Sequence, residues 1–466
     1  MKKKLSTADL LTRRRLLGTA AAGAAAVPLV GCATSGSSDD QDEITVGDDP
    51  DNPFDVDPEA PLEVVIFDGG FGEEYAIAHQ EIYNEKFADA EIEHTATQQI
   101  AETQQPQFAA GEPADVIDNS GAQQIPMDSL INDGELMELT ALLDAPSYDN
   151  AEVTVRDTLR PGVLQAGTYN GQMYSLNYIF SAWTLWYDGA LFADNGWDEP
   201  QTWEEMIDLC SEIQDAGIAP WTYPGEHPVY LYDMLLILAG KHGGVDVAKA
   251  IDNLEPDAWY NDSMVKAVEA MYSLHESGFI LPGSPGLDHI GAQTAFNENE
   301  AAFIPCGSWL PNEQLGIARE DFEYVPVGVF PLEGSAQPGL ISAGGEEPFI
   351  VPSNATNPAG AFEYLRMMLS QEGAQAFGDA VQAATVVEGV DVDNQAAQLT
   401  SEMVSDPDDL FQPQFRFWYS RMDDEVTSAL GALMSGNNEP EEFLERMQNI
   451  ADETADDDSI EHFTHD

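Results

Sequence analysis

Alternating strand-like and helix-like segments early in the chain constrain the fold most strongly. They follow one another in this order: strand 62–67, helix 73–88, strand 91–97, helix 99–110 and strand 114–118. The strands are compact and rich in β-branched residues, whereas the helices repeat apolar residues at a spacing of three or four. Strand, helix, strand, helix, strand is typical of an α/β domain with a largely parallel sheet. We therefore predict an α/β fold.

Small polar residues follow two of these predicted strands. Asp68 and Gly69 come directly after the first strand, and Asn119 and Ser120 come after the third. In open parallel sheets, ligands bind outside the carboxyl ends of the strands. These four residues are therefore candidate ligand contacts, and the alternative is that they only form turns.

A second alternation follows a predicted hairpin that turns on Asn170 and Gly171. Further helices are expected at 189–195, 202–216, 229–239, 262–277 and 292–299, and further strands at 218–222 and 301–304. The chain has 466 residues, more than one hydrophobic core usually supports, so we expect two domains. No segment recurs at a fixed period, which argues against a solenoid.

The N-terminus carries an export signal. A twin-arginine pattern at 12–17 is followed by an apolar, small-residue run that ends at Val30 and is too short to span a membrane comfortably. The run leads into Leu29-Val30-Gly31-Cys32, which resembles the lipobox of bacterial lipoproteins, in which the cysteine is lipidated and becomes the new N-terminus. We predict a signal peptide over 1–32, export by the twin-arginine route and a lipid anchor on Cys32. The alternative is a plain signal peptide with a coincidental cysteine.

Residues 33–61 are rich in Ser, Asp, Pro and Gly and show almost no apolar periodicity. Such a segment buries too little apolar surface to offset its ordering entropy, so we predict an acidic, disordered tether. Its aspartate clusters at 48–51 and 55–57 lack the turn glycine and bidentate glutamate of a calcium loop, which favours a solvated linker without a metal.

Acidic residues outnumber basic ones by 84 to 17, for a formal net charge of −67. A field of this sign repels nucleic acid and anionic membrane surfaces, so nucleic acid is not expected as a partner. It also disfavours anionic ligands and leaves neutral or cationic ones. The main interpretation of the charge is solubility in a salty or otherwise harsh exterior.

Seven short motifs follow one another in a characteristic order. They lie at 64–70, 111–117, 170–176, 185–188, 200–205, 296–303 and 307–309. In this order the chain resembles extracellular solute-binding proteins of the carbohydrate-import ABC class (family 1), over residues 61 to about 435. Within that class, segments 176–187 and 217–228 are most similar to N-acetylglucosamine/diacetylchitobiose-binding lipoproteins.

The resemblance implies a two-lobed, periplasmic-binding-protein-like (type II) α/β fold with a hinge and an interlobe ligand cleft. It implies a first lobe of 61–181 and 302–348, a second lobe of 182–301 and 349–435, and a C-terminal segment of 436–466. Residues 451–466 are expected to form a poorly ordered acidic tail. Cys210 and Cys306 would fall in opposite lobes, where a disulfide would lock the hinge, so we predict free thiols.

Binding a sugar requires aromatic platforms for its C–H faces and short polar side chains for its hydroxyl rim. The predicted ligand-binding residues are Asp68, Gly69, Asn119, Ser120, Phe180, Trp183, Trp221, Tyr223, Glu226, Trp309 and Trp418. The resemblance places Trp309 where this class usually has a stacking aromatic residue. The alternative for each aromatic candidate is core packing, and Phe180 and Trp183 could serve either the hinge or the cleft.

The function implied is that of a substrate-binding lipoprotein of an ABC-type carbohydrate importer, held at the outer face of the cell membrane. It would capture N-acetylglucosamine or chitobiose-type sugars by cleft closure and deliver them to the permease transmembrane subunits. We expect a monomer, with no cofactor, no metal and no catalytic residue. The alternatives are a binding protein for another oligosaccharide and an exported glycoside hydrolase, although nothing singles out a catalytic pair among 84 acids.

Overall fold

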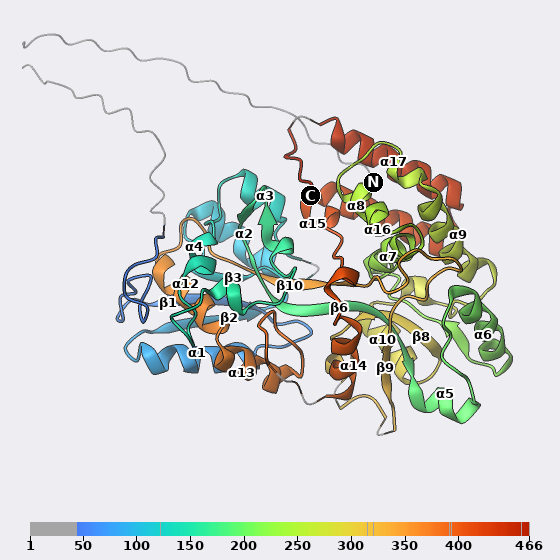
Figure 1. Ribbon diagram of the computed structural model, residues 1–466, viewed down its shortest axis with the longest axis horizontal. Helices are drawn as coiled ribbons and strands as arrows, with labels where there is room; N and C mark the ends of the chain where they lie inside the picture. Colours follow the sequence, from blue (N-terminus) through green and yellow to red (C-terminus); the bar gives the residue numbers. More distant parts are fainter. Residues whose placement is uncertain are drawn as a thin grey trace, which may run out of the picture. The chain divides into compact units, whose positions relative to one another are not determined.

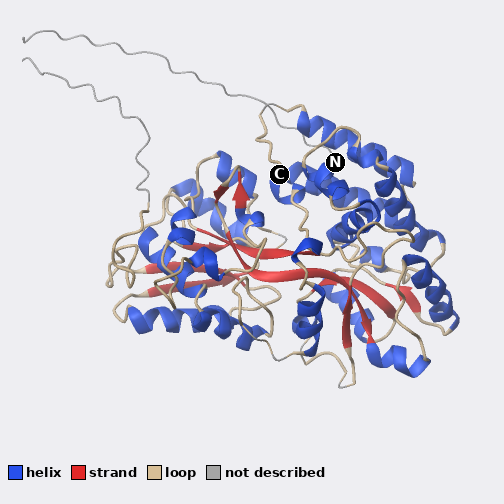
Figure 2. Ribbon diagram, viewed as in Figure 1, coloured by secondary structure: helices blue, strands red, loops and turns tan. Residues whose placement is uncertain are grey.

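An eight-stranded mixed sheet runs through the part of the chain that the computed structural model describes, residues 44–466 without 122, 315, 320, 391, 393, 458 and 466. Its strands are β1 Leu62–Phe67, β2 Ile92–Thr97, β3 Val116–Asp118, β6 Leu176–Asp188, β7 Ala219–Trp221, β8 Ala301–Gly307, β9 Tyr324–Val327 and β10 Ser342–Ile350. The order is β2-β1-β3-β10-β6-β8-β7, and β9 also pairs with β6. Figure 2 shows these strands in red with helices around them. The predicted signal peptide and Cys32 lie outside the described residues.

The first lobe forms as its sequence pattern predicts. Strands β1, β2 and β3 are parallel, and their bounds confirm the expected strands within two residues. Its helices are α1 Glu74–Lys86, α2 Ile100–Ala110, α3 Met127–Asn132, α4 Thr140–Asp144, α12 Pro358–Met368 and α13 Gln371–Val381. The hairpin of β4 Thr168–Tyr169 and β5 Gln172–Met173 turns on Asn170 and Gly171, which both have positive φ as a two-residue turn of this kind requires.

The second lobe is built mainly of helices around β7, β8, β9 and the second half of β6. These helices are α5 Gly189–Asn195, α6 Trp203–Asp215, α7 Tyr232–Gly243, α8 Asp246–Asp252, α9 Asp262–Glu276, α10 His289–Asn297, α11 Leu310–Glu313, α14 Gln395–Met403, α15 Phe415–Trp418, α16 Ser420–Met434 and α17 Pro440–Ala455. The side chain of Thr202 caps α6 by accepting from the N–H of Glu205, as predicted.

Two long antiparallel strands, β6 and β10, join the lobes. The first half of β6 pairs with β10, and from Trp183 onward β6 pairs with β8. Figure 1 shows both strands crossing between the helices of the first lobe and those of the second. The two-lobed α/β architecture is therefore confirmed, and its lobes share a continuous sheet at the crossing.

Two expected lobe segments are placed differently. Strand β8 lies between β6 and β7 and β9 pairs with β6, so β8 and β9 belong to the second lobe and not to the first. Conversely, α12 and α13 pack on α1 in the first lobe. The ring of Phe377 in α13 lies 5.1 Å from Tyr75 and 5.4 Å from Tyr178. The chain returns to the first lobe along β10, later than expected.

The cysteine prediction is confirmed for a different reason from the one given. Cys210 in α6 and Cys306 in β8 are buried free thiols, and both belong to the second lobe. Cys210 lies in the cluster that contains Met206, whereas Cys306 packs with Trp186 and Phe296 in a separate cluster. The two thiols remain unpaired because they lie in different core clusters of one lobe, and not because a hinge separates them.

The chain packs closely at both ends of the described region, where disorder was expected. Phe54 and Val56, within the expected tether, are buried, and the Phe54 ring lies 5.5 Å from Phe362 in α12. At the other end, α17 runs to Ala455, and Phe463 and His465 are only 4% and 9% exposed. Buried aromatic residues hold each of these acidic segments in place. The overall composition of the segments, which predicts disorder, does not reveal them.

Candidate functional site

Three partly exposed aromatic rings meet where β6 passes from the first lobe to the second. They are Trp183 in β6, Tyr230 in the short helix η3 Pro228–Leu231, and Trp309, which follows β8. The Trp183 ring centroid lies 4.9 Å from that of Trp309 and 5.4 Å from that of Tyr230, edge to face in both cases. We call these residues the aromatic trio. Such rings present both apolar faces and polar N–H or O–H edges.

A glycine fixes the position of Trp309. Gly307 ends β8 and pairs with Trp183, and a Cβ added to Gly307 would lie 2.0 Å from the Trp309 ring. No larger residue could occupy this position with the indole in place. The sequence motif at 307–309 therefore encodes a close approach between backbone and ring.

Glu346 of β10 links the trio to the hinge strands. The indole N–H of Trp183 donates to Oε1 of Glu346 at 2.6 Å. Burial raises the pKa of Glu346 to about 7, against the opposing effects of this hydrogen bond and of the Arg416 guanidinium. A carboxyl group near its midpoint at neutral pH can either donate or accept a hydrogen bond.

A second acidic group lies at the carboxyl end of β3. Burial raises the pKa of Asp118 to about 7, although the Ser120 hydroxyl donates to this carboxylate. Burial and the nearby Asp118 charge also raise the pKa of Glu347 well above its usual range. The backbone φ of Glu347 is +57°, a conformation that costs energy for a residue with a side chain. Asp118, Ser120 and Glu347 therefore bring first-lobe polar groups beside the β10 crossing.

The last residue of β1, Phe67, contributes a further aromatic ring. A Cβ on Gly69 would lie 2.0 Å from the Phe67 ring, and one on Gly121 would lie 2.3 Å from it. Phe67 is partly exposed, and its N–H donates to Asp118 at 3.4 Å. The predicted candidate Gly69 thus has a defined role, which is to leave room for this ring.

The two lobes touch each other near the turn after β1. A Cβ on Gly70, in the first lobe, would lie 2.9 Å from Oε1 of Glu313 in α11 of the second lobe. The side-chain amide of Asn312 donates to the carbonyl oxygen of Val381 in the first lobe. The polar turn after β1 therefore faces the second lobe directly.

The structure does not bring all predicted aromatic residues to this place. Trp221 and Tyr223 are each 1% exposed and Trp418 is 3% exposed. The Trp221 ring lies 5.7 Å from Phe303, and its N–H donates to the Met206 sulfur at 3.3 Å. These three residues therefore pack in the core, which was the alternative stated for each of them.

Some of the remaining candidates are buried and others are exposed. Asn119 is fully buried, and its side chain bonds to both the N–H and the carbonyl oxygen of Ile125 at 2.8 Å, so it forms a turn. Phe180 is buried beneath the Arg160 guanidinium, 5.2 Å from its ring. Glu226 is exposed in a loop, and Asp68 is partly exposed after β1.

Sequence reasoning missed Phe67, Asp118, Tyr230, Glu346 and Glu347. One signal was available: Glu346 and Glu347 stand together in the middle of a strand that is otherwise small and apolar. Burying an acidic residue in a central strand costs folding free energy, so such residues are often found at functional sites. Tyr230 and Phe67 carry no such signal, because their partners come from distant parts of the chain.

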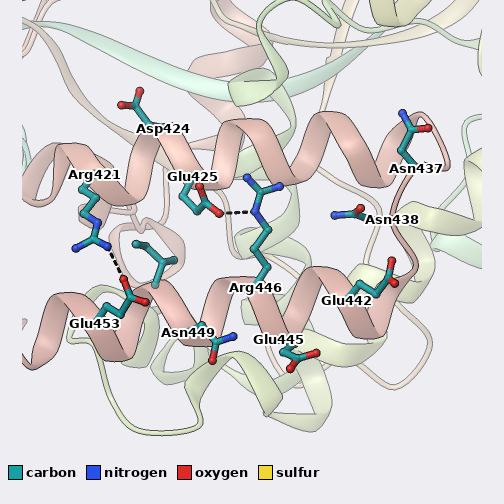
Figure 3. A pocket seen from close by; sticks show the side chains of 11 residues that line it. Arg421, Asp424, Glu425, Asn437, Asn438, Glu442, Glu445, Arg446, Asn449 and Glu453 are labelled. Carbon is teal, nitrogen blue, oxygen red and sulfur yellow. Dashed lines mark hydrogen bonds and ion pairs between the residues drawn. The ribbon is translucent and has the colours of Figure 1, made fainter.

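A separate groove of about 790 Å³ lies between α16 and α17 (Figure 3). Ion pairs of Arg421 with Glu453 and of Arg446 with Glu425 cross it. Apart from Ile450, its lining residues are polar or charged, and none of them is aromatic. It lacks the platform that the face of a sugar ring requires.

Comparison with known proteins supports a shared architecture. Residues 70–375 match the family model described as bacterial extracellular solute-binding protein. A diacetylchitobiose binding protein of Streptomyces coelicolor is 30% identical over 467 aligned residues, which cover 97% of this chain and 98% of that protein. A multiple sugar-binding protein of Streptococcus mutans is 22% identical and covers 58% of this chain and 64% of its own length.

Solved structures share the fold at low sequence identity. A chitin oligosaccharide binding protein superposes with a TM-score of 0.66 at 20% identity, covering 81% of this chain and 95% of that one. The apo form of RafE from Streptococcus pneumoniae gives a TM-score of 0.68 at 16% identity, covering 85% of this chain and 98% of that one.

Among the residues that the structure describes, no helix is long and apolar enough to cross a membrane.

Proposed function

Because this chain belongs to the family of bacterial extracellular solute-binding proteins, we propose that it captures a sugar for an ABC-type carbohydrate importer. The observation that carries the proposal is the aromatic trio at the crossing of the lobes, where the indole N–H of Trp183 donates a hydrogen bond to Glu346. Aromatic faces suit the C–H faces of a sugar ring, and carboxyl groups suit its hydroxyl rim.

The site has contributions from both lobes and from the strands between them. Trp309 and Tyr230 belong to the second lobe, and Glu346 lies on β10. Phe67 is the last residue of the first-lobe strand β1, and Asp68 follows it. A sugar between these groups would contact both lobes at once. Such a ligand favours the closed arrangement, by no more than its differential affinity for closed over open. Closure then presents the surface that the permease transmembrane subunits recognise.

We propose N-acetylglucosamine or a chitobiose-type disaccharide as the ligand. The support is the 30% identity with a diacetylchitobiose binding protein over nearly the whole of both chains. Another oligosaccharide is the alternative ligand. Capture requires no covalent step and no cofactor, and the protein would act as a monomer without enzymatic activity.

We further propose that Cys32 carries the lipid that holds the protein at the outer face of the membrane after twin-arginine export. The tether would keep the receptor near its permease while leaving it free to turn. A Cys32→Ser variant should move from the membrane fraction to the soluble extracytoplasmic fraction. Retention in the membrane fraction would contradict the anchor.

Calorimetric titration tests the sugar proposal. The chain should bind diacetylchitobiose or N-acetylglucosamine saturably and bind maltose and cellobiose more weakly. A parallel assay for sugar release should show no turnover. Turnover would favour the glycoside hydrolase alternative, and no heat with any of the four sugars would contradict sugar capture.

A further inference from the structure

Residues 459–465, the segment after α17, pack against the second lobe, and two of their side chains, those of Phe463 and His465, are buried. The N–H of Phe463 donates to the Tyr419 hydroxyl at 2.9 Å, and that hydroxyl donates to the Phe463 carbonyl oxygen at 3.2 Å. The Phe463 ring lies 5.7 Å from that of Trp418. Phe463 is therefore held by the region where α15 meets α16.

His465 forms the second attachment to this lobe. Its Nε2 lies 2.6 Å from Oδ2 of Asp252, the last residue of α8, and its N–H donates to Oδ1 of Asn253 at 2.7 Å. Asp252 is fully buried and also accepts from the N–H groups of Gln414 and Phe415. The His465 ring packs 4.9 Å from Trp418. His465 is thus held in a buried site formed by Asp252, Asn253 and Trp418.

The same segment also contacts the first lobe. The Phe463 ring lies 5.4 Å from Tyr169 in the β4–β5 hairpin. The Asn170 side chain donates to Glu461, and the Gln165 side chain bonds to Nδ1 of His465. Tyr169 and Phe463 belong to one apolar cluster that extends from the second-lobe core to α2 of the first lobe.

The hairpin is itself fixed to the first lobe. The N–H of Leu139 donates to the carbonyl oxygen of Met173 at 2.6 Å, and the N–H of Met173 donates to Glu138 at 3.3 Å. Any movement of the hairpin away from Trp418 and Asp252 therefore requires the first lobe to move as well. That movement would separate the Phe463 ring from Tyr169.

We propose that residues 459–465 form a strap between the lobes that restrains their opening and so contributes to ligand affinity. The strap is a connection in addition to β6, β10 and the return of the chain before α14. It stabilises the arrangement in which Asn312 also reaches across to Val381. Because a ligand that bridges the lobes needs them close together, weakening the strap favours open states that bind poorly.

The variant Phe463→Ala removes the ring that both lobes share. Hydrogen–deuterium exchange of the full chain should become several-fold faster at the amides of 168–173, and calorimetry should show diacetylchitobiose binding weakened about three- to tenfold. Thr464→Ala is the matched control, since this neighbour is exposed. It should behave as the wild type in both measurements.

Because Phe463→Ala could also destabilise the whole protein, a second variant is needed to separate the two effects. Gln165→Ala cuts only the first-lobe contact of His465 and should accelerate exchange at 168–173 without lowering the urea midpoint of the second lobe. Unchanged hairpin exchange in both variants, or faster exchange with unchanged affinity, would overturn the strap. If the wild type binds no sugar, the proposed function fails, whereas the exchange data still decide whether the strap joins the lobes.

Discussion

Two groups of aromatic residues in this protein have contrasting surroundings, since one is partly exposed and the other is buried. The trio of Trp183, Tyr230 and Trp309 is partly exposed at the lobe crossing, and its Trp183 donates a hydrogen bond to a carboxyl group. Trp221 and Trp418 are buried within the second lobe. Exposure and a polar partner at the crossing, and not residue type, distinguish a candidate platform for a sugar from a core residue.

The comparison explains why aromatic content alone is a weak guide to a sugar site. Trp221 lies within a predicted strand and Trp309 follows another, but the Trp221 ring packs between Phe303 and Trp203. Trp309 turns back over Gly307 and remains partly exposed. The following predictions contrast the two groups, starting with the largest effect.

The largest effect is expected for Trp221→Ala. Removing a buried indole leaves a cavity in the second-lobe core, so the free energy of unfolding should fall by about 3–5 kcal/mol. Urea denaturation at neutral pH measures this loss. The variant that remains folded should bind sugar almost as the wild type does. Strong loss of affinity with normal stability would place Trp221 in the site after all.

Trp309→Ala should show the reverse pattern. Losing one stacking face should weaken diacetylchitobiose binding by about 1–3 kcal/mol, measured by calorimetry. The expected loss of stability is smaller than that of Trp221→Ala, because the ring is partly exposed. Unchanged affinity would return Trp309 to a purely structural role.

The variant Glu346→Gln tests the carboxyl partner of the trio. Burial raises the pKa of Glu346 to about 7, so the folded state holds a proton that the unfolded state loses above pH 4.5. The wild type should therefore lose stability as pH rises from about 4.5 to about 7. Glu346→Gln should escape this loss and be more stable than the wild type by about 1–2 kcal/mol at pH 8, allowing for water near this partly exposed group.

Urea midpoints at pH 4.5 and pH 8 measure this difference. Glu226→Gln serves as the matched control, because it removes a carboxylate from an exposed loop. Equal pH dependence in the wild type and Glu346→Gln would show that Glu346 is not desolvated in the free protein.

The smallest effect is expected for Glu226→Ala. Glu226 was a predicted ligand contact, but it is exposed, and its N–H donates to the Leu287 carbonyl oxygen whatever its side chain. Both stability and sugar affinity should change by less than about 0.5 kcal/mol. A tenfold loss of affinity would mean that closure brings this loop onto the ligand.

Local patterns predicted the elements of this fold well. The strands β1 to β3, the Asn170-Gly171 hairpin and the capped helix α6 follow from periodicity and turn chemistry. Lobe membership from β8 onward could not be predicted from such patterns, because it depends on how far β6 and β10 extend across the crossing. Likewise, Phe463 became a buried anchor through partners more than 40 residues away in sequence, such as Tyr419.

The candidate site was predicted only in part for the same reason. Trp183 and Trp309 were identified, but their partner Glu346 lies 163 residues from Trp183 in the chain. Asn119 has the right residue type at a strand end, yet a local turn uses its side chain fully. A sequence shows which residues could contact a ligand, and tertiary packing decides which of them do.

A crystal structure of the chain with diacetylchitobiose would test the central claim most directly. We predict that a sugar ring lies against Trp309 or Trp183, with a hydroxyl or acetamido group hydrogen-bonded to Glu346, and with both lobes in contact with the ligand. A sugar bound in the groove between α16 and α17, or bound beside Trp221 with the trio free, would contradict the account.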